Sequence, residues 1–125
     1  MASHTSEDVF EYTGEDCYVP RDVVSVRFHS SVIGVPANDH TFKGTSLKEV
    51  ELNEGLLKIC MWAFKNCNSL ERIVFPSTVT EIDSYAFQYC NSLKEVVLNE
   101  GLERIGSHTF EDCKSLYRVS RSLLL

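Results

Sequence analysis

The sequence lacks several features that would place it in a well-defined functional class. No apolar run approaches the roughly 20 residues that span a bilayer. The opening stretch MASHTSEDVFEYTGEDC has neither the basic flank nor the apolar segment of a secretory signal. We therefore expect no membrane span and a cytoplasmic protein, unless the chain is a fragment. Basic residues are also few, with 12 Lys and Arg against 18 Asp and Glu, so no basic patch can meet phosphate and we expect no nucleic-acid binding.

Motifs of catalysis are missing as well. The four histidines form no H-x-x-x-H or H-E-x-x-H pattern, and neither G-x-S-x-G nor a nucleotide-binding glycine motif occurs. The acidic residues of the repeats alternate with basic ones, which does not produce a paired-carboxylate site. We therefore expect a protein that is not an enzyme and that binds no cofactor.

The five cysteines are an odd number in a chain without an export signal, which argues against disulfide bonds. Three of them, Cys67, Cys90 and Cys113, follow one another at intervals of 23 residues. One thiol per repeat does not supply the four converging ligands of a zinc site, so we interpret these three as small apolar core residues. Cys60 is the strongest candidate for a reactive thiol, and a thiol-based redox or metal site is the least supported functional alternative.

The sequence does contain a 23-residue repeat, which occurs three times in succession. Residues 47–69 and 93–115 agree at 13 of 23 positions, and residues 70–92 follow the same pattern. A looser copy covers residues 23–46 and a partial copy covers residues 116–125. One such unit cannot bury its own apolar face, so successive units must stack and cover one another, as in a solenoid.

The two ends of the predicted repeat region, residues 23–125, differ. Residues 1–22 hold six acids and one base, a net charge of −5. We interpret them as an acidic lead and a partial cap, in which residues 12–22, with Tyr12, Tyr18, Val19 and Pro20, cover the first repeat. The other end, LYRVSRSLLL, begins a strand and has no cap. We expect either a truncated chain or end-to-end self-association through this uncapped C-terminus.

The apolar positions of each repeat predict its local structure. Val50 and Leu52 stand two residues apart, which is the period of a strand, and the following Gly55 ends that strand. The apolar residues around Phe64 stand too close together for a half-exposed strand. We therefore predict an α/β leucine-rich-repeat solenoid whose 23-residue coils each contain a short strand and a short helix or turn. The predicted inward columns are Leu47, Leu70 and Leu93; Val50, Ile73 and Val96; Leu52, Phe75 and Leu98; Leu56, Val79 and Leu102; Ile59, Ile82 and Ile105; Phe64, Phe87 and Phe110; and the three cysteines.

The full pattern resembles a known family. Leu-x-x-Val-x-Leu, then Gly-Leu-x-x-Ile, then Ala-Phe-x-x-Cys-x-Ser is similar to the BspA-like leucine-rich repeats, and the lead-in YTGEDCYVPRDVVSVRFHSSV resembles the segment before the first repeat in diatom members. The resemblance covers roughly residues 12–121. It departs from the family at Cys60 and Asp83, where glycine is favoured. The asparagine of ordinary leucine-rich repeats is absent, and its place is taken by Gly55, Thr78 and Gly101.

Charged residues also recur in columns. If the repeats stack as parallel strands, equivalent residues lie about 4.7–4.9 Å apart, and like charges in one column would repel. Every neighbouring pair is instead opposite in sign, which supports the register. These columns are Lys48, Glu71 and Lys94; Glu49, Arg72, Glu95 and Arg118; and Lys58, Glu81 and Arg104.

The family resemblance implies adhesion or recognition of a protein partner, which the sequence does not identify. A structural spacer, or a fragment of a longer repeat protein without its own ligand, is the alternative. Aromatic side chains are favoured in binding hot spots, although here they can also serve only to shield the turn between coils. The first candidate surface is this aromatic column, Trp62, Tyr85 and His108. The second is the outward strand column, Arg27, Glu51, Val74 and Val97, continued by Ser120.

Overall fold

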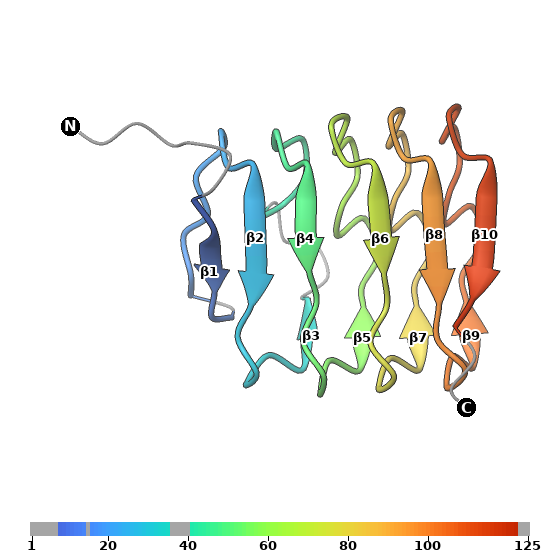
Figure 1. Ribbon diagram of the computed structural model, residues 1–125, viewed down its shortest axis with the longest axis horizontal. Helices are drawn as coiled ribbons and strands as arrows, with labels where there is room; N and C mark the ends of the chain where they lie inside the picture. The colour runs from blue at the N-terminus through green and yellow to red at the C-terminus, as the bar shows by residue number, and fades with distance from the viewer. Residues whose placement is uncertain (1–7, 15, 36–40, 123–125) are drawn as a thin grey trace.

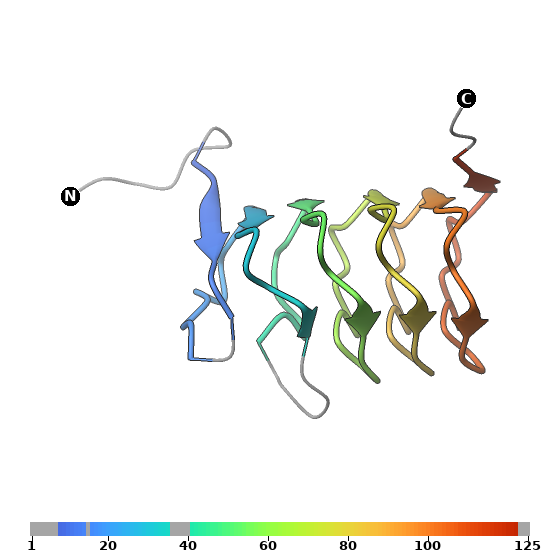
Figure 2. The ribbon, with the colours of Figure 1, turned by 90° about the horizontal axis from the view of Figure 1, so that it is seen from below.

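The computed structural model describes residues 8–14, 16–35 and 41–122. Over these residues the chain winds into a solenoid whose coils stack along its long axis, with two rows of short strands (Figures 1 and 2). The first row contains β1 (Phe10–Tyr12), β2 (Ser25–Phe28), β4 (Glu49–Glu51), β6 (Arg72–Val74), β8 (Glu95–Leu98) and β10 (Arg118–Arg121). The second row contains β3 (Gly34–Val35), β5 (Lys58–Ile59), β7 (Glu81–Ile82) and β9 (Arg104–Ile105).

Both rows are parallel, and their full repeats keep a 23-residue register. In the first row Val96 pairs with Ile73. In the second row Ile82 lies between Ile59 and Ile105. The predicted stacking of 23-residue coils is therefore confirmed. The structure adds a second strand to each coil, which the sequence did not predict because two residues are too few to show an alternation.

The predicted short helix or turn of each coil does not form a helix. The described residues contain strands and turns but no helix, so none is long and apolar enough to cross a membrane. Around Phe64, the Lys65 N–H donates to the Trp62 carbonyl at 3.1 Å, which closes a tight turn. Trp62 and Asn66 have φ angles of 62° and 61°. Residues in this left-handed conformation interrupt a right-handed helix.

These turns form a third side of the coil with hydrogen bonds of its own. The Phe64 N–H donates forward to the Ala86 carbonyl of the next coil at 2.7 Å. On the second strand row the direction is reversed, because the Asp83 N–H donates back to the Ile59 carbonyl at 2.8 Å. Both directions recur between the next two coils. Neighbouring coils are therefore joined by opposed sets of backbone hydrogen bonds.

Equivalent side chains stack to form the core. The rings of Phe42, Phe64, Phe87 and Phe110 follow one another with centroid separations of 5.1, 5.1 and 5.6 Å. Phe64 and Phe87 are fully buried, and Phe110 packs against the same core. The prediction that the repeat phenylalanines share one interior is confirmed.

The two ends of the described solenoid differ in how well the core is covered. At the first end, Tyr12 of β1 and Val19 are buried, but Tyr18 is 77% exposed, so its predicted role in covering the first repeat is wrong. At the other end, Ile105 is 46% exposed and Val119 is 54% exposed, whereas their equivalents Ile82 and Val96 are fully buried. Ile105 therefore occupies its predicted inward column but keeps solvent contact, because the described residues contain no further coil to cover it.

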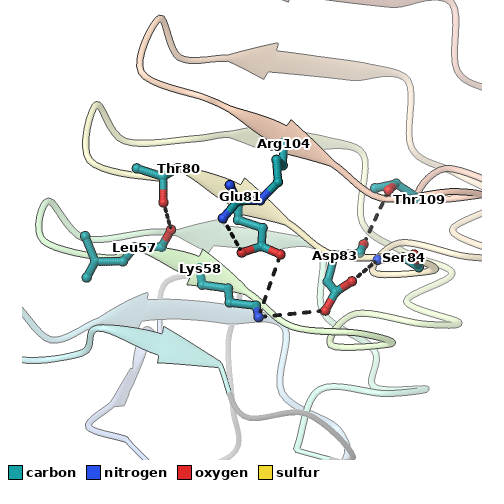
Figure 3. A network of polar contacts seen from close by, with 8 residues as sticks. All are labelled: Leu57, Lys58, Thr80, Glu81, Asp83, Ser84, Arg104 and Thr109. Carbon is teal, nitrogen blue, oxygen red and sulfur yellow. Dashed lines mark hydrogen bonds and ion pairs between the residues drawn. The ribbon is translucent and has the colours of Figure 1, made fainter.

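Ion pairs follow the predicted charge columns. Glu81 lies 3.8 Å from Lys58 and 3.2 Å from Arg104 (Figure 3). Two further columns are joined by Lys48–Glu71 (4.0 Å), Glu71–Lys94 (3.5 Å), Arg72–Glu95 (2.6 Å) and Glu95–Arg118 (3.5 Å). One neighbouring pair, Glu49 and Arg72, forms no ion pair in the described structure. Arg72 turns to Glu95 instead, because β4 and β6 are not joined in one sheet.

Buried asparagine side chains hold the bends that follow β4 and β8. Asn53 Nδ2 donates to the Val32 carbonyl at 2.9 Å, and Asn99 Nδ2 donates to the Val79 carbonyl at 2.8 Å. These amides satisfy carbonyls of the preceding coil, two residues before the position that asparagine occupies in ordinary leucine-rich repeats. The equivalent residue of the middle repeat is Pro76, which offers neither a side-chain amide nor a backbone N–H.

Candidate functional site

Four ring side chains and one lysine gather on the turn side of the coils. Trp62, Tyr85 and His108 form one row, with ring centroids 6.1 Å apart for the first pair and 5.2 Å apart for the second. Tyr89 lies in the neighbouring column, and Lys65 Nζ lies 6.0 Å from the Trp62 ring centroid and 5.7 Å from that of Tyr89. We call these five residues the aromatic face. The structure thus places the predicted aromatic column in a continuous stack.

The rings of the aromatic face are carried on a strained backbone. Trp62, Tyr85, Tyr89 and His108 have φ angles of 62°, 59°, 63° and 58°. A residue with a Cβ atom loses roughly 1–2 kcal/mol in this left-handed region, whereas glycine and asparagine adopt it readily. Side chains this bulky are therefore not what the turn alone requires. The same conformation recurs at Asn66 and Asp112, so the turn of each full repeat has two left-handed positions.

The aromatic face is partly open to solvent and carries charge at its edges. Trp62 is 37% exposed and Tyr89 is 36% exposed. The Glu111 carboxylate lies 3.8 Å from His108 Nε2, and Lys65 stands at the other edge. Tryptophan and tyrosine are enriched in protein-binding hot spots, and both are present here.

The outward strand column lies on the first strand row. Register places Arg27 beside Glu51, and Val74 beside Val97, which lies beside Ser120. Glu51 and Val74 belong to β4 and β6, which are not hydrogen-bonded to each other. The structure therefore brings Val74 and Val97 together as predicted, but it divides the column into two halves.

A groove lies at this division, where β4 and β6 stand further apart than the other neighbours of their row (Figure 1). Its volume is about 810 Å³, and it continues into a hollow of about 350 Å³. Val50, Arg72 and Val74 line both spaces, and Leu52 and Phe75 extend the apolar wall. We call this feature the β4–β6 groove.

The cysteine column is structural in its geometry. The Cys67 thiol donates to the Phe42 carbonyl at 3.0 Å, and the Cys90 thiol donates to the Phe64 carbonyl at 3.1 Å. Hydrogen bonding with the thiols of Cys113 and Cys67, together with burial, raises the pKa of Cys90. All five cysteines are free of disulfide bonds. In the part of the chain that the structure describes, no three His, Cys, Asp or Glu side chains converge in a way that could hold a metal ion.

The repeats match a known family over most of the chain. Six copies of the BspA type leucine rich repeat region match within residues 11–122. The chain belongs to the BspA-type leucine-rich repeat family. The resemblance to the BspA-like leucine-rich repeats is therefore confirmed. No curated protein matches this BspA-type chain in sequence.

Solved structures share the fold. The T. pallidum leucine rich repeat protein (TpLRR) has a TM-score of 0.77 and 37% identity, over 87% of this chain and 50% of that one. A leucine-rich repeat protein from Bacteroides ovatus ATCC 8483 has a TM-score of 0.75 and 28% identity, over 90% of this chain and 30% of that one. The fold alone is shown by a leucine rich cell surface protein from Faecalibacterium prausnitzii A2-165, which is 22% identical. Its TM-score is 0.79, over 97% of this chain and 34% of that one. The BspA-type chain thus spans half or less of each structure.

Sequence reasoning missed two members of the aromatic face, Tyr89 and Lys65. Tyr89 stands in the column of Asn66 and Asp112, and all three have positive φ angles. Asparagine and aspartate are the side chains that tolerate this conformation best after glycine. The signal was therefore available, because a tyrosine between Asn66 and Asp112 is out of place in a column that the backbone reserves for small polar residues.

Proposed function

We propose that this BspA-type chain is a non-enzymatic interaction module that binds a protein partner through the aromatic face. The observation that carries this proposal is the placement of Trp62, Tyr85, Tyr89 and His108, whose bulky side chains occupy left-handed backbone positions. Asn66 adopts the same left-handed conformation, which asparagine tolerates with less strain than a bulky aromatic residue. The fold supports this function, since repeat proteins bind through surfaces built from equivalent positions of successive coils.

The test replaces two rings by the residue that the backbone favours. In the double variant Trp62→Asn, Tyr89→Asn, we expect unchanged or higher thermal stability, because both left-handed positions are relieved of strain. Partner capture from an extract of the source organism should fall strongly, as measured by pull-down and quantitative mass spectrometry. Tyr117→Asn is the matched control, since Tyr117 is a 76% exposed aromatic residue outside the aromatic face.

The outcome separates binding from its alternatives. If the double variant captures the same proteins in the same amounts as the unmodified chain, the aromatic face does not bind and the structural spacer is favoured. If the double variant loses stability, the rings serve to shield the turns. The end-to-end self-association predicted from the C-terminus is a separate proposal, supported by the exposed Ile105 and Val119.

A further inference from the structure

The β4–β6 groove is a break in an otherwise paired row of strands. The Phe75 N–H donates to the Val97 carbonyl at 3.1 Å across the β6–β8 pair. The equivalent groups one coil earlier, the Leu52 N–H and the Val74 carbonyl, do not bond to each other. Backbone donors and acceptors of β4 and β6 therefore face each other across the groove. Unpaired strand edges of this kind are the surfaces to which an added strand binds.

Two residues of the middle repeat, Pro76 and Phe75, disfavour closure of the break. In the β8–β10 pair, the Ser122 N–H donates to the Leu98 carbonyl at 2.7 Å. Pro76 occupies the position of Ser122 in its own coil and has no N–H to donate to Leu52. Phe75 is also larger than the leucines of its column, and its ring packs edge-on into the core. The middle repeat is thus built in a way that disfavours closure on β4.

The two coils on either side of the groove remain joined elsewhere. On the second strand row, β5 pairs with β7, and the Asp83 N–H donates to the Ile59 carbonyl at 2.8 Å. On the turn side, the Phe64 N–H donates to the Ala86 carbonyl at 2.7 Å. The groove therefore opens on one side only, and the intact sides can act as a hinge when it widens.

The groove combines apolar walls with a surplus of carboxylates. Val50 points to the interior column, while Val74 is 40% exposed on the outer side. Glu49 and Glu51 flank Val50 on β4 and are exposed, and neither forms an ion pair within the described residues. The nearby Arg72 is already neutralised by Glu95 at 2.6 Å. Register places Arg27 beside Glu51. The combined lining nevertheless holds five carboxylates, those of Glu49, Glu51, Glu54, Glu71 and Glu100, against the two cations Lys48 and Arg72. The groove therefore has a net negative charge.

We propose that the β4–β6 groove binds an extended peptide with alternating apolar and cationic side chains, which adds as a strand beside β4. Side chains of a strand alternate between its two faces. The apolar ones would then contact Val50 and Phe75 on the inner side, and the cationic ones would reach Glu49 and Glu51 on the outer side. Full insertion separates β4 from β6 by about 9.6 Å, twice the strand spacing, so binding bends the solenoid about its intact sides. This site is separate from the aromatic face.

The experiment uses a short fluorescent peptide that alternates valine and lysine, and a second that alternates valine and glutamate. Fluorescence anisotropy should show saturable binding of the lysine peptide to the full chain and none of the glutamate peptide. Glu49→Gln with Glu51→Gln should weaken binding by about tenfold. The control pair Glu11→Gln with Glu103→Gln removes the same charge from other surfaces and should leave affinity unchanged.

Two further measurements test the groove itself. Pro76→Asn supplies the missing N–H and the amide found at Asn99, so it should close the groove, abolish peptide binding and raise thermal stability. If Pro76→Asn does not fold, Val74→Arg adds a repelling cation at an exposed position and should also abolish binding. Hydrogen exchange at the Leu52 and Val74 amides should slow when the peptide is bound.

Several results would overturn the proposal. These are equal binding of both peptides, equal loss of affinity in the control pair, binding retained by Pro76→Asn and Val74→Arg, or unchanged hydrogen exchange in β4 and β6 at saturation. The double variant of Trp62 and Tyr89 should bind the lysine peptide as the unmodified chain does. Failure of the groove and failure of the aromatic face are therefore distinguished.

Discussion

The phenylalanine ladder gives a quantitative test of how the coils hold one another. Phe64 is fully buried and stacks on Phe42 and Phe87 with centroid separations of 5.1 Å on both sides. An aromatic pair contributes about 0.5–1.5 kcal/mol beyond the burial of apolar area. Phe64→Leu keeps an apolar side chain but removes two ring contacts. We therefore expect it to lower the free energy of unfolding by about 1–3 kcal/mol.

The same substitution at the end of the ladder provides the comparison. Phe110 has one stacked partner, Phe87, at 5.6 Å, and it is only partly buried. Phe110→Leu should therefore lower the free energy of unfolding by about 0.5–1.5 kcal/mol, roughly half the effect at Phe64.

Urea denaturation followed by circular dichroism measures both values, and each kcal/mol should also shift the melting temperature by about 4 °C. The m-value should stay constant, because neither variant changes the area exposed on unfolding. An equal loss at Phe64 and Phe110, or no loss at Phe64, would refute the idea that ring contacts between coils stabilise the solenoid.

Two further predictions concern the bends and the open end of the solenoid. Asn99 is 3% exposed and donates to the Val79 and Ser77 carbonyls at 2.8 and 3.2 Å. Asn99→Ala leaves these two acceptors unsatisfied and should lower the free energy of unfolding by about 2–4 kcal/mol. Thermal melts measure this effect, and an unchanged melting temperature would contradict the role of Asn99. Because Ile105 and Val119 expose apolar surface, we expect sedimentation velocity to show a mass that grows with protein concentration. Ile105→Lys with Val119→Lys should restore the monomer, and a monomeric mass for the unmodified chain at all concentrations would exclude end-to-end self-association.

The register of the solenoid could be predicted because it is written in side chains that recur every 23 residues. Phe64 and Phe87 can share one dry interior only if their coils stack in step, and the charge columns exclude a slip by one repeat. The local conformation near Phe64 could not be predicted in the same way. Apolar spacing there is compatible with a helical turn or with two tight turns, and the sign of φ at Trp62 decides between them. That sign depends on hydrogen bonds to the next coil, which a single repeat does not reveal.

The two candidate surfaces also differ in how far the sequence predicts them. The row of Trp62, Tyr85 and His108 was visible in the sequence because its members occupy one column. The β4–β6 groove was not visible in the sequence, because it arises where two neighbouring coils do not pair their strands. Pro76 marks a bend in the sequence, but the loss of one N–H and the bulk of Phe75 matter only when β4 is in place beside them.

The opposed hydrogen bonds on the two sides of each coil have an electrostatic consequence. In an α-helix all peptide dipoles point one way and sum to partial charges at the termini. Here the forward bond from Phe64 to Ala86 and the backward bond from Asp83 to Ile59 oppose each other's dipoles within one layer. These opposed bonds partly cancel along the axis, so the axial dipole grows less with each added coil than it would if all the bonds pointed one way.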